Sequence, residues 1–398
     1  MGQRCLHNKE KRTLVYNKKI AFAAACSGML VFGMTIVTLG SLAKELQEKF
    51  SLSNYDSGTL FSILPFGLII GSVFSGPVAD RYGYRNLIAL AAIGIFIGFE
   101  GIAYSDSLVL LRAFIFLFGI SAGVINGATN SIVVDLSDEH KGPNLSILGI
   151  FFGLGALGMP LLLSVLITRM SPLQVLAGLG WITLLAGISY KFVQFPPAKQ
   201  TQGKVKVEWN KLIKPILILI SFFLFFQSSL ESIITNWTTI YIGSKQLMSE
   251  SKALFALSIH MLGTVLMRVV TGTLMRKASQ VSILWLCLFL LLLGVILMQA
   301  GTNSYIVIAG LFLSGAGVSG GFPVMLGFVG HHFPTISATA ISFVFVVALI
   351  GNMLINYLTG IIIQQYGVEY LPIICYVEIV VMVIFFFFII KQLNLKNN

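Results

Sequence analysis

Polar side chains that could hold a small solute recur in this chain at helical spacing. Three pairs of amide or acidic residues lie four positions apart: Asn126 and Asn130, Gln227 and Glu231, and Asn352 and Asn356. That spacing places both members on one helix face, and amides offer donors and acceptors together, as sugar hydroxyls require. Trp237 follows Glu231 by six positions and adds an aromatic face for a sugar ring. The pairs predict a site for a neutral polyol, and hydrogen bonding between helices is the alternative.

Three ionisable residues stand inside long apolar runs: Glu231, Arg268 and His260. Ionisable groups are costly at membrane depth, so they indicate a functional site by default. Arg268 is predicted either to pair with Glu231 across two helices or to meet an anionic substrate. His260 is either a proton relay or a packed side chain. We take all three as candidates for coupling to an ion.

The remaining chemistry-bearing residues form no recognisable site. We place Glu100, Arg112 and Glu378 towards the outer ends of their helices, where Glu100 could pair with Arg112. His331 and His332 do not belong to an HExxH pattern, and the four cysteines form no CxxC pair. We therefore expect no metal site and no resident cofactor, with H⁺ or Na⁺ as the candidate coupling ion.

The chain around these residues is strongly apolar. Of its 398 residues, 56% are hydrophobic and 10% are charged, whereas a soluble domain carries about 25% charged residues. A water-soluble fold cannot bury that much apolar surface, so lipid must surround most of the chain. The net charge of +11 lies in short connectors, which indicates membrane orientation rather than binding to nucleic acid.

A helix needs about 20 apolar residues to cross the hydrocarbon core, and lipid leaves helices as the fitting structure for such runs. Twelve candidate spans follow one another: Ile20–Leu42, Ser57–Val78, Asn86–Ala103, Leu108–Val134, Leu145–Thr168, Leu173–Gln194, Leu212–Ile240, Ala253–Met275, Val281–Ala300, Tyr305–Phe328, Ala338–Ile363 and Leu371–Ile390. An even number of spans puts both termini on one side. Basic residues concentrate on that side, which the positive-inside rule assigns to the cytoplasm.

A basic connector divides the twelve spans into six and six. We expect one half over residues 1–194, a cytoplasmic linker over 195–211 and a second half over 212–398. Two six-helix halves with the substrate held between them near mid-membrane are a common plan of secondary transporters.

The segment between spans two and three carries a motif. It reads GSVFSGPVADRYGYRNL from Gly71 to Leu87, and its spaced residues are Gly76, Asp80, Arg81, Gly83 and Arg85. Gly76 suits close helix contact and Gly83 suits a tight turn. The pattern resembles the signature of the major facilitator superfamily, except that Tyr84 stands where the first of two basic residues is usual. The resemblance implies alternating-access transport, and a cytoplasmic gate formed by these residues with Asp135.

Three further blocks resemble the fucose permease-like branch of sugar:proton symporters. They cover residues 126–135, 228–241 and 320–342. That branch implies proton coupling through carboxylates in spans one and four. Here span one contains no carboxylate, and Asn126 occupies the position of the span-four acid. Glu231 is therefore the remaining coupling candidate, and uncoupled facilitation is an alternative.

Together these features predict an all-α integral membrane protein of the bacterial inner membrane, with twelve helices in two six-helix halves. We expect a monomer that carries a monosaccharide by alternating access. One alternative is a multidrug or amphiphile exporter of the same superfamily, which the 31 Phe residues permit. Another is a membrane sensor without transport. An enzyme would require a cluster of nucleophile, base or metal ligands, which the sequence does not show.

Overall fold

Long helices account for almost all of the structure. A computed structural model describes residues 17–137, 141–197, 213–274, 278–333 and 337–394. Within these ranges there is no strand, and twelve helices are long and apolar enough to cross a membrane. The prediction of an all-α membrane protein with twelve spans is confirmed.

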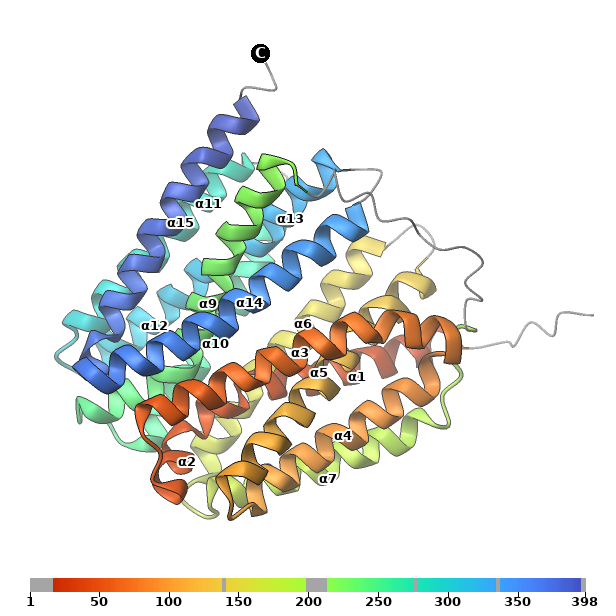
Figure 1. Cartoon of the computed structure of the whole chain (residues 1–398), viewed down its shortest axis with the longest axis horizontal. Coiled ribbons are helices and arrows are strands. Elements are labelled where there is room, and N and C mark those ends of the chain that lie inside the picture. The colour runs from red at the N-terminus through yellow and green to blue at the C-terminus, as the bar shows by residue number, and fades with distance from the viewer. Residues whose placement is uncertain (1–16, 138–140, 198–212, 275–277, 334–336, 395–398) are drawn as a thin grey trace, which may run out of the picture.

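The helices form two groups (Figure 1). The N-terminal group consists of α1 (Lys18–Ser41), α2 (Ala43–Phe50), α3 (Asn54–Tyr82), α4 (Tyr84–Tyr104), α5 (Leu108–Leu136), α6 (Lys141–Leu166) and α7 (Pro172–Tyr190). The C-terminal group consists of α9 (Pro215–Ser244), α10 (Glu250–Leu274), α11 (Gln280–Ala300), α12 (Ser304–Val318), α13 (Gly321–His332), α14 (Ser337–Tyr366), the 3-10 turn η1 (Val368–Tyr370) and α15 (Leu371–Asn394). Most of the expected linker lies outside the described residues.

Local sequence signals set several helix ends. The Asn17 side chain accepts hydrogen bonds from the first turn of α1, and Ser53 and Asp56 form a capping box at the start of α3. Such caps satisfy backbone N–H groups that have no partner within the helix. Gly83 separates α3 from α4 with φ 79°, a conformation that glycine adopts without steric cost. The tight turn predicted at Gly83 is present.

The tenth span is interrupted. We expected one continuous helix from Tyr305 to Phe328, but α12 ends at Val318 and α13 begins at Gly321. The side chain of Gln227 from α9 occupies this position and donates a hydrogen bond from Nε2 to the Val318 carbonyl, at 2.7 Å. In an unbroken helix that carbonyl would accept from Phe322. The amide therefore satisfies a backbone group at membrane depth that the interruption would otherwise leave bare.

Small residues allow neighbouring helices to approach closely. In α5 a side chain added at Gly119 or Gly123 would collide with backbone carbonyls of α3. In α6 the same is true of Gly155, which lies against the backbone of Leu30 in α1. Glycines four positions apart in α5 therefore let this helix pack closely against α3, and van der Waals contact is a main force available to helices in lipid.

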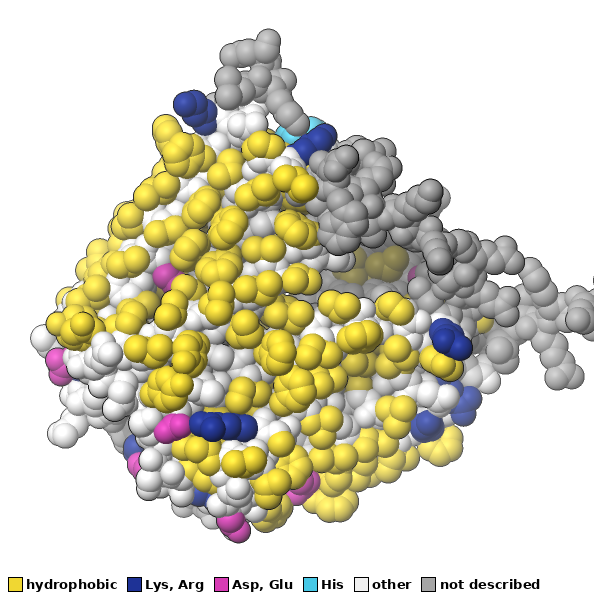
Figure 2. Space-filling view, viewed as in Figure 1, with side chains coloured by type: hydrophobic (Ala, Val, Ile, Leu, Met, Phe, Trp, Pro, Cys, Tyr) yellow, Lys and Arg dark blue, Asp and Glu magenta, His cyan; other side chains and the backbone are white. Residues whose placement is uncertain are grey.

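The surface has the pattern of a membrane protein. Hydrophobic side chains cover the broad middle of the face in Figure 2, and most charged side chains lie near its two ends. We call the end where α1 begins and α15 ends the termini side, and the other end the opposite side (Figure 1).

We predict that Gly155→Ala destabilises the protein whereas Gly158→Ala on the same helix does not. The added methyl at Gly155 meets rigid backbone, and overpacking of this kind costs about 1–3 kcal/mol. An added Cβ at Gly158 has no described atom within 4 Å. Thermal unfolding in detergent measures both variants, and equal melting temperatures would contradict the packing assigned to α1 and α6.

Candidate functional site

A hollow lies between the two groups of helices on the termini side (Figure 2). Helices α3 and α14 run side by side near the opposite side and separate towards the termini side (Figure 1). A hydrogen bond joins the two helices, because Ser62 Oγ of α3 donates to the Met353 carbonyl of α14 at 2.8 Å. The hollow in this face therefore opens towards the termini side.

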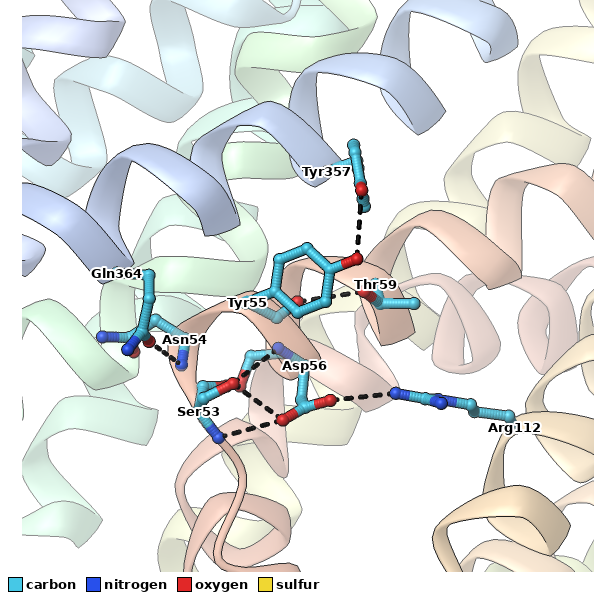
Figure 3. A network of polar contacts seen from close by, with 9 residues as sticks. Ser53, Asn54, Tyr55, Asp56, Thr59, Arg112, Tyr357 and Gln364 are labelled. Atoms are coloured by element: carbon cyan, nitrogen blue, oxygen red, sulfur yellow. Dashed lines mark hydrogen bonds and ion pairs between the residues drawn. The ribbon is translucent and has the colours of Figure 1, made fainter.

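Polar contacts close the opposite side between α3 and α14 (Figure 3). The backbone N–H of Asn54 donates to Gln364 Oε1 at 2.9 Å. The hydroxyl groups of Tyr55 and Tyr357 lie 3.1 Å apart. One turn further along α3, Gly58 faces Gly360 closely enough that a Cβ on either residue would crowd the other helix. These contacts join the two groups where each of the two helices meets the opposite side.

Two other helix pairs extend this closure. In α6 and α10, Ser164 Oγ donates to the Ser251 carbonyl at 2.9 Å and Ser251 Oγ donates to the Ser164 carbonyl at 2.8 Å. Lys44 of α2 forms an ion pair with Glu250 of α10 at 3.1 Å. We call the Lys44–Glu250 pair the opposite-side latch.

Arg112 has a different partner from the one expected. Its Nη2 donates to Asp56 Oδ1 at 2.9 Å (Figure 3), whereas Glu100 Oε1 is buried without a hydrogen bond in the described part of the chain. The predicted pairing of Glu100 with Arg112 is wrong. The close approach of α3 to α5 brings Asp56 to Arg112, while Glu100 lies against Gly180 of α7.

The ion pair between Glu231 and Arg268 lies within the spans. Arg268 Nη2 is 3.8 Å from Glu231 Oε1, and the two side chains are 32% and 24% exposed. The Arg268 guanidinium also lies 5.4 Å from the ring centre of Phe152 in α6, and Phe152 packs on Phe32 of α1. The pair therefore belongs to the C-terminal group but touches the N-terminal group. A contact this long and this exposed leaves both charges able to take a further partner.

The amide pairs differ in their surroundings. Asn126 and Asn130 are half-buried on α5, and Asn130 Nδ2 donates to Asn126 Oδ1 at 3.0 Å. Asn352 is also half-buried, but Asn356 is 0% exposed. Asn356 Nδ2 donates to Ser232 Oγ of α9 at 2.9 Å. Asn356 therefore joins α14 to α9 in this arrangement.

Sequence reasoning missed two members of this cluster. Asn236 Nδ2 donates to Ser232 Oγ at 3.0 Å and to Asn356 Oδ1 at 3.2 Å. Ser232 and Asn236 lie four positions apart in the sequence. The spacing used for the other pairs could therefore have found them.

Three other predicted residues are sealed from the hollow. Gln227 is held at the α12–α13 interruption, and His260 Nδ1 lies within 3.1 Å of the Leu311 carbonyl and 3.0 Å of Ser314 Oγ. Trp237 is 0% exposed, and its ring meets Phe61 of α3 edge-on at 5.3 Å. Gln227 and His260 connect helices within the C-terminal group, and Trp237 helps to close the opposite side.

The motif between α3 and α4 is arranged around its unusual tyrosine. Tyr84 is buried, and its hydroxyl donates to Asp135 Oδ2 of α5 at 2.8 Å. Arg81 and Arg85 are exposed, and the Asp80 side chain lies outside the described residues. An added Cβ at Gly76 has no described atom within 4 Å, so the close helix contact expected there is not formed in this arrangement.

Glu378 lies in the outer part of its helix, as expected, because it is the eighth of the 24 residues of α15. It is nevertheless buried, with 3% of the residue exposed. Ser229 Oγ of α9 lies 3.0 Å from its Oε1, within hydrogen-bond distance.

The sequence profile of the Major Facilitator Superfamily matches residues 21–301 and 247–397. The chain belongs to the major facilitator superfamily. It is therefore a multi-pass membrane transporter rather than an enzyme, as the sequence predicted.

Several curated proteins that resemble this superfamily member at low identity are named as transporters. The chain is 23% identical over 355 residues to the inner membrane transport protein YdiN of Escherichia coli, covering 85% of this chain and 82% of that one. It is 27% identical over 129 residues to a D-xylose transporter of Levilactobacillus brevis, which is 32% of this chain and 28% of that one. It is 29% identical over 130 residues to the glucose transporter GlcP of Staphylococcus epidermidis, with the same two shares.

Solved structures share the superfamily fold. A D-xylose-proton symporter has a TM-score of 0.78 with 14% identity, covering 93% of this chain and 97% of that one. A mutant of the nucleoside transporter NupG has a TM-score of 0.79 with 14% identity, covering 94% and 99%. At this identity the likeness concerns the fold alone.

We predict that Lys44 and Glu250 stabilise each other only weakly at neutral pH. A double-mutant cycle of Lys44→Gln and Glu250→Gln should give a coupling of about 0.2–1 kcal/mol, because the pair is partly exposed. The hydrogen bond that Lys44 donates to the Glu250 carboxylate raises the pKa of Lys44 above its ordinary 10.5.

This direction sets the pH window. The pKa of Lys44 is higher in the folded protein than in the unfolded chain. Its contribution to the free energy of unfolding is therefore complete below the unfolded-state pKa, and it is lost as the pH rises through the folded-state pKa. Thermal unfolding of the four proteins in detergent should therefore show a coupling that is constant near neutral pH, begins to fall above pH 10.5 and is lost once the pH exceeds the raised folded-state pKa of Lys44. Additive effects at pH 7 would show that the latch does not exist in solution.

Proposed function

We propose that this transporter moves a monosaccharide across the bacterial inner membrane, with the sugar held between the two groups of helices. The observation that carries the proposal is the half-exposed Glu231–Arg268 pair, which contacts the N-terminal group through Phe152. Relatives named as D-xylose and glucose transporters support the class of substrate.

Four residues with half-buried polar groups are assigned to the sugar: Asn126, Asn130, Glu231 and Asn352. Their amide and carboxylate groups can accept from and donate to hydroxyls. Gln227, Trp237 and Asn356 take a supporting role in this arrangement, since all three are buried and hold α9 against its neighbours. They reach the sugar only if α9 moves.

Both termini are proposed to lie in the cytoplasm, because the positive-inside rule favours that orientation. The structure would then be the inward-facing state, closed at the opposite side and open to the cytoplasm. Alternating access requires a second state in which the latch and the α3–α14 contacts separate. The residues around Tyr84 and Asp135 then meet the C-terminal group and close the cytoplasmic side.

Coupling to an ion is proposed at Glu231. The Glu231 carboxylate would interact either with Arg268 or with a bound H⁺ or Na⁺. Binding of the ion would therefore break the Glu231–Arg268 ion pair. Arg268 acts as the counter-charge when the ion is absent. His260 is proposed only as a packing residue, because Leu311 and Ser314 hold its ring.

We expect proteoliposomes containing the purified protein to take up labelled D-xylose or D-glucose faster than protein-free liposomes. Glu231→Gln should reduce the uptake roughly tenfold to a hundredfold, because a hydrogen bond to a charged group contributes about 1.5–3 kcal/mol. Asp106→Asn is the matched control, since that side chain is 95% exposed and is distant from the proposed site in sequence.

Two outcomes would contradict parts of this proposal. Unchanged uptake in Glu231→Gln would remove Glu231 from the binding site. Absence of uptake for a panel of hexoses and pentoses, combined with resistance of cells to dyes or detergents, would favour the amphiphile exporter instead. The aromatic rings of Phe152 and Phe32 beside Arg268 would suit such a substrate.

A further inference from the structure

Glu378 is a buried acid that the proposed sugar site does not use. It lies seven residues after Leu371, where α15 begins, which is roughly 10 Å along a helix. The hydrocarbon core is about 30 Å thick, so the carboxyl group lies within the apolar length of the span. A buried ionisable group at this depth requires a physical reason.

Among the described residues, the helices packed against α15 offer Glu378 no positive partner. Helices α11 and α14 contain no Asp, Glu, Lys, Arg or His, and Lys391 of α15 itself is thirteen positions away. The one charged residue of α9 is Glu231, whose carboxylate pairs with Arg268. The fully buried thiol of Cys375 lies one turn earlier on α15, and η1 contributes Glu369 and Tyr370 at the membrane end.

The hydrogen bonds around Ser229 lack a proton donor. Ser229 Oγ lies 2.8 Å from the Phe226 carbonyl, 3.0 Å from the Phe225 carbonyl and 3.0 Å from Glu378 Oε1. A serine hydroxyl has one proton, so it cannot donate fully to three acceptors. The other carboxyl oxygen, Oε2, is buried and has no hydrogen bond within the described residues. The cluster has more acceptors than donors.

One added proton relieves the competition for the serine proton. A carboxylic acid at Glu378 can donate from Oε1 to Ser229 Oγ, while Ser229 donates to a carbonyl of its own helix. Protonation also leaves Oε2 as the oxygen of a neutral acid, which removes an unpaired negative charge that is costly inside the membrane.

We propose that Glu378 is a proton-binding site of the C-terminal group, occupied in the arrangement of this structure. The step is COO⁻ plus H⁺ giving COOH, with no other reactant. Ser229 stands two positions before Glu231 on α9, so a movement of α9 that opens or closes the sugar site also changes the hydrogen bond at Glu378. This link to transport rests on the proposed function, whereas the proton site itself does not.

Infrared spectroscopy of the full chain in proteoliposomes tests the site without any substrate. The spectrum of wild type minus Glu378→Gln should contain the C=O stretch of a protonated carboxylic acid at pH 7. That band should give way to carboxylate bands only at alkaline pH. Carboxylate bands at pH 7 in this difference spectrum would overturn the proposal.

A second variant guards against misfolding of Glu378→Gln. In Ser229→Ala the carboxyl group is retained but loses its hydrogen-bond partner, so the same C=O band should move to higher frequency. No band change in Ser229→Ala would also overturn the assignment. Asp106→Asn should leave this band unchanged, because its exposed carboxylate is not part of the cluster.

The coupling role has its own readout. If a sugar is taken up together with protons, Glu378→Gln should lower the number of protons that enter per sugar, while exchange of labelled for unlabelled sugar continues. An unchanged ratio of protons to sugar in the variant would remove Glu378 from coupling. Failure of every sugar to be transported would count against the proposed function but would leave the infrared result intact.

Discussion

Every polar group inside this protein must find its partner within the protein, because lipid offers none. The structure meets this requirement in different ways at different depths. Near the opposite side, serine, tyrosine and amide groups join α3 to α14 and α6 to α10. Deeper, Gln227 satisfies a carbonyl exposed by an interrupted helix, and Ser232, Asn236 and Asn356 satisfy one another.

Where that requirement is met incompletely, function is the natural explanation. Glu231 and Arg268 meet only at 3.8 Å and remain partly exposed. Glu378 keeps one oxygen without a described partner. Both acids contact or belong to α9, which therefore connects the proposed sugar site, the proposed proton site and the α12–α13 interruption. Because α9 contacts all three, a movement of this helix at one of them also changes the contacts at the other two.

The fold was predictable because its causes are local. Runs of apolar residues specify spans, and glycines four apart in span four specify the close approach of α5 to α3. The partners of individual polar residues were less predictable, because they depend on how helices rotate. Arg112 could have met either Asp56 or Glu100, and only the packing of α3 against α5 selects Asp56. Likewise, the sequence shows that Asn352 and Asn356 share a face, but not that Ser232 and Asn236 of α9 meet Asn356.

The interruption at Ser319 and Gly320 has a mechanical consequence. An unbroken helix behaves as a stiff rod, so a push at one membrane face is felt at the other. Here Ser319 and Gly320 keep helical dihedral angles, but the Val318 carbonyl is bonded by a side chain of α9 instead of by its own helix. The bond from Gln227 therefore makes α9 share any load that is carried along this span.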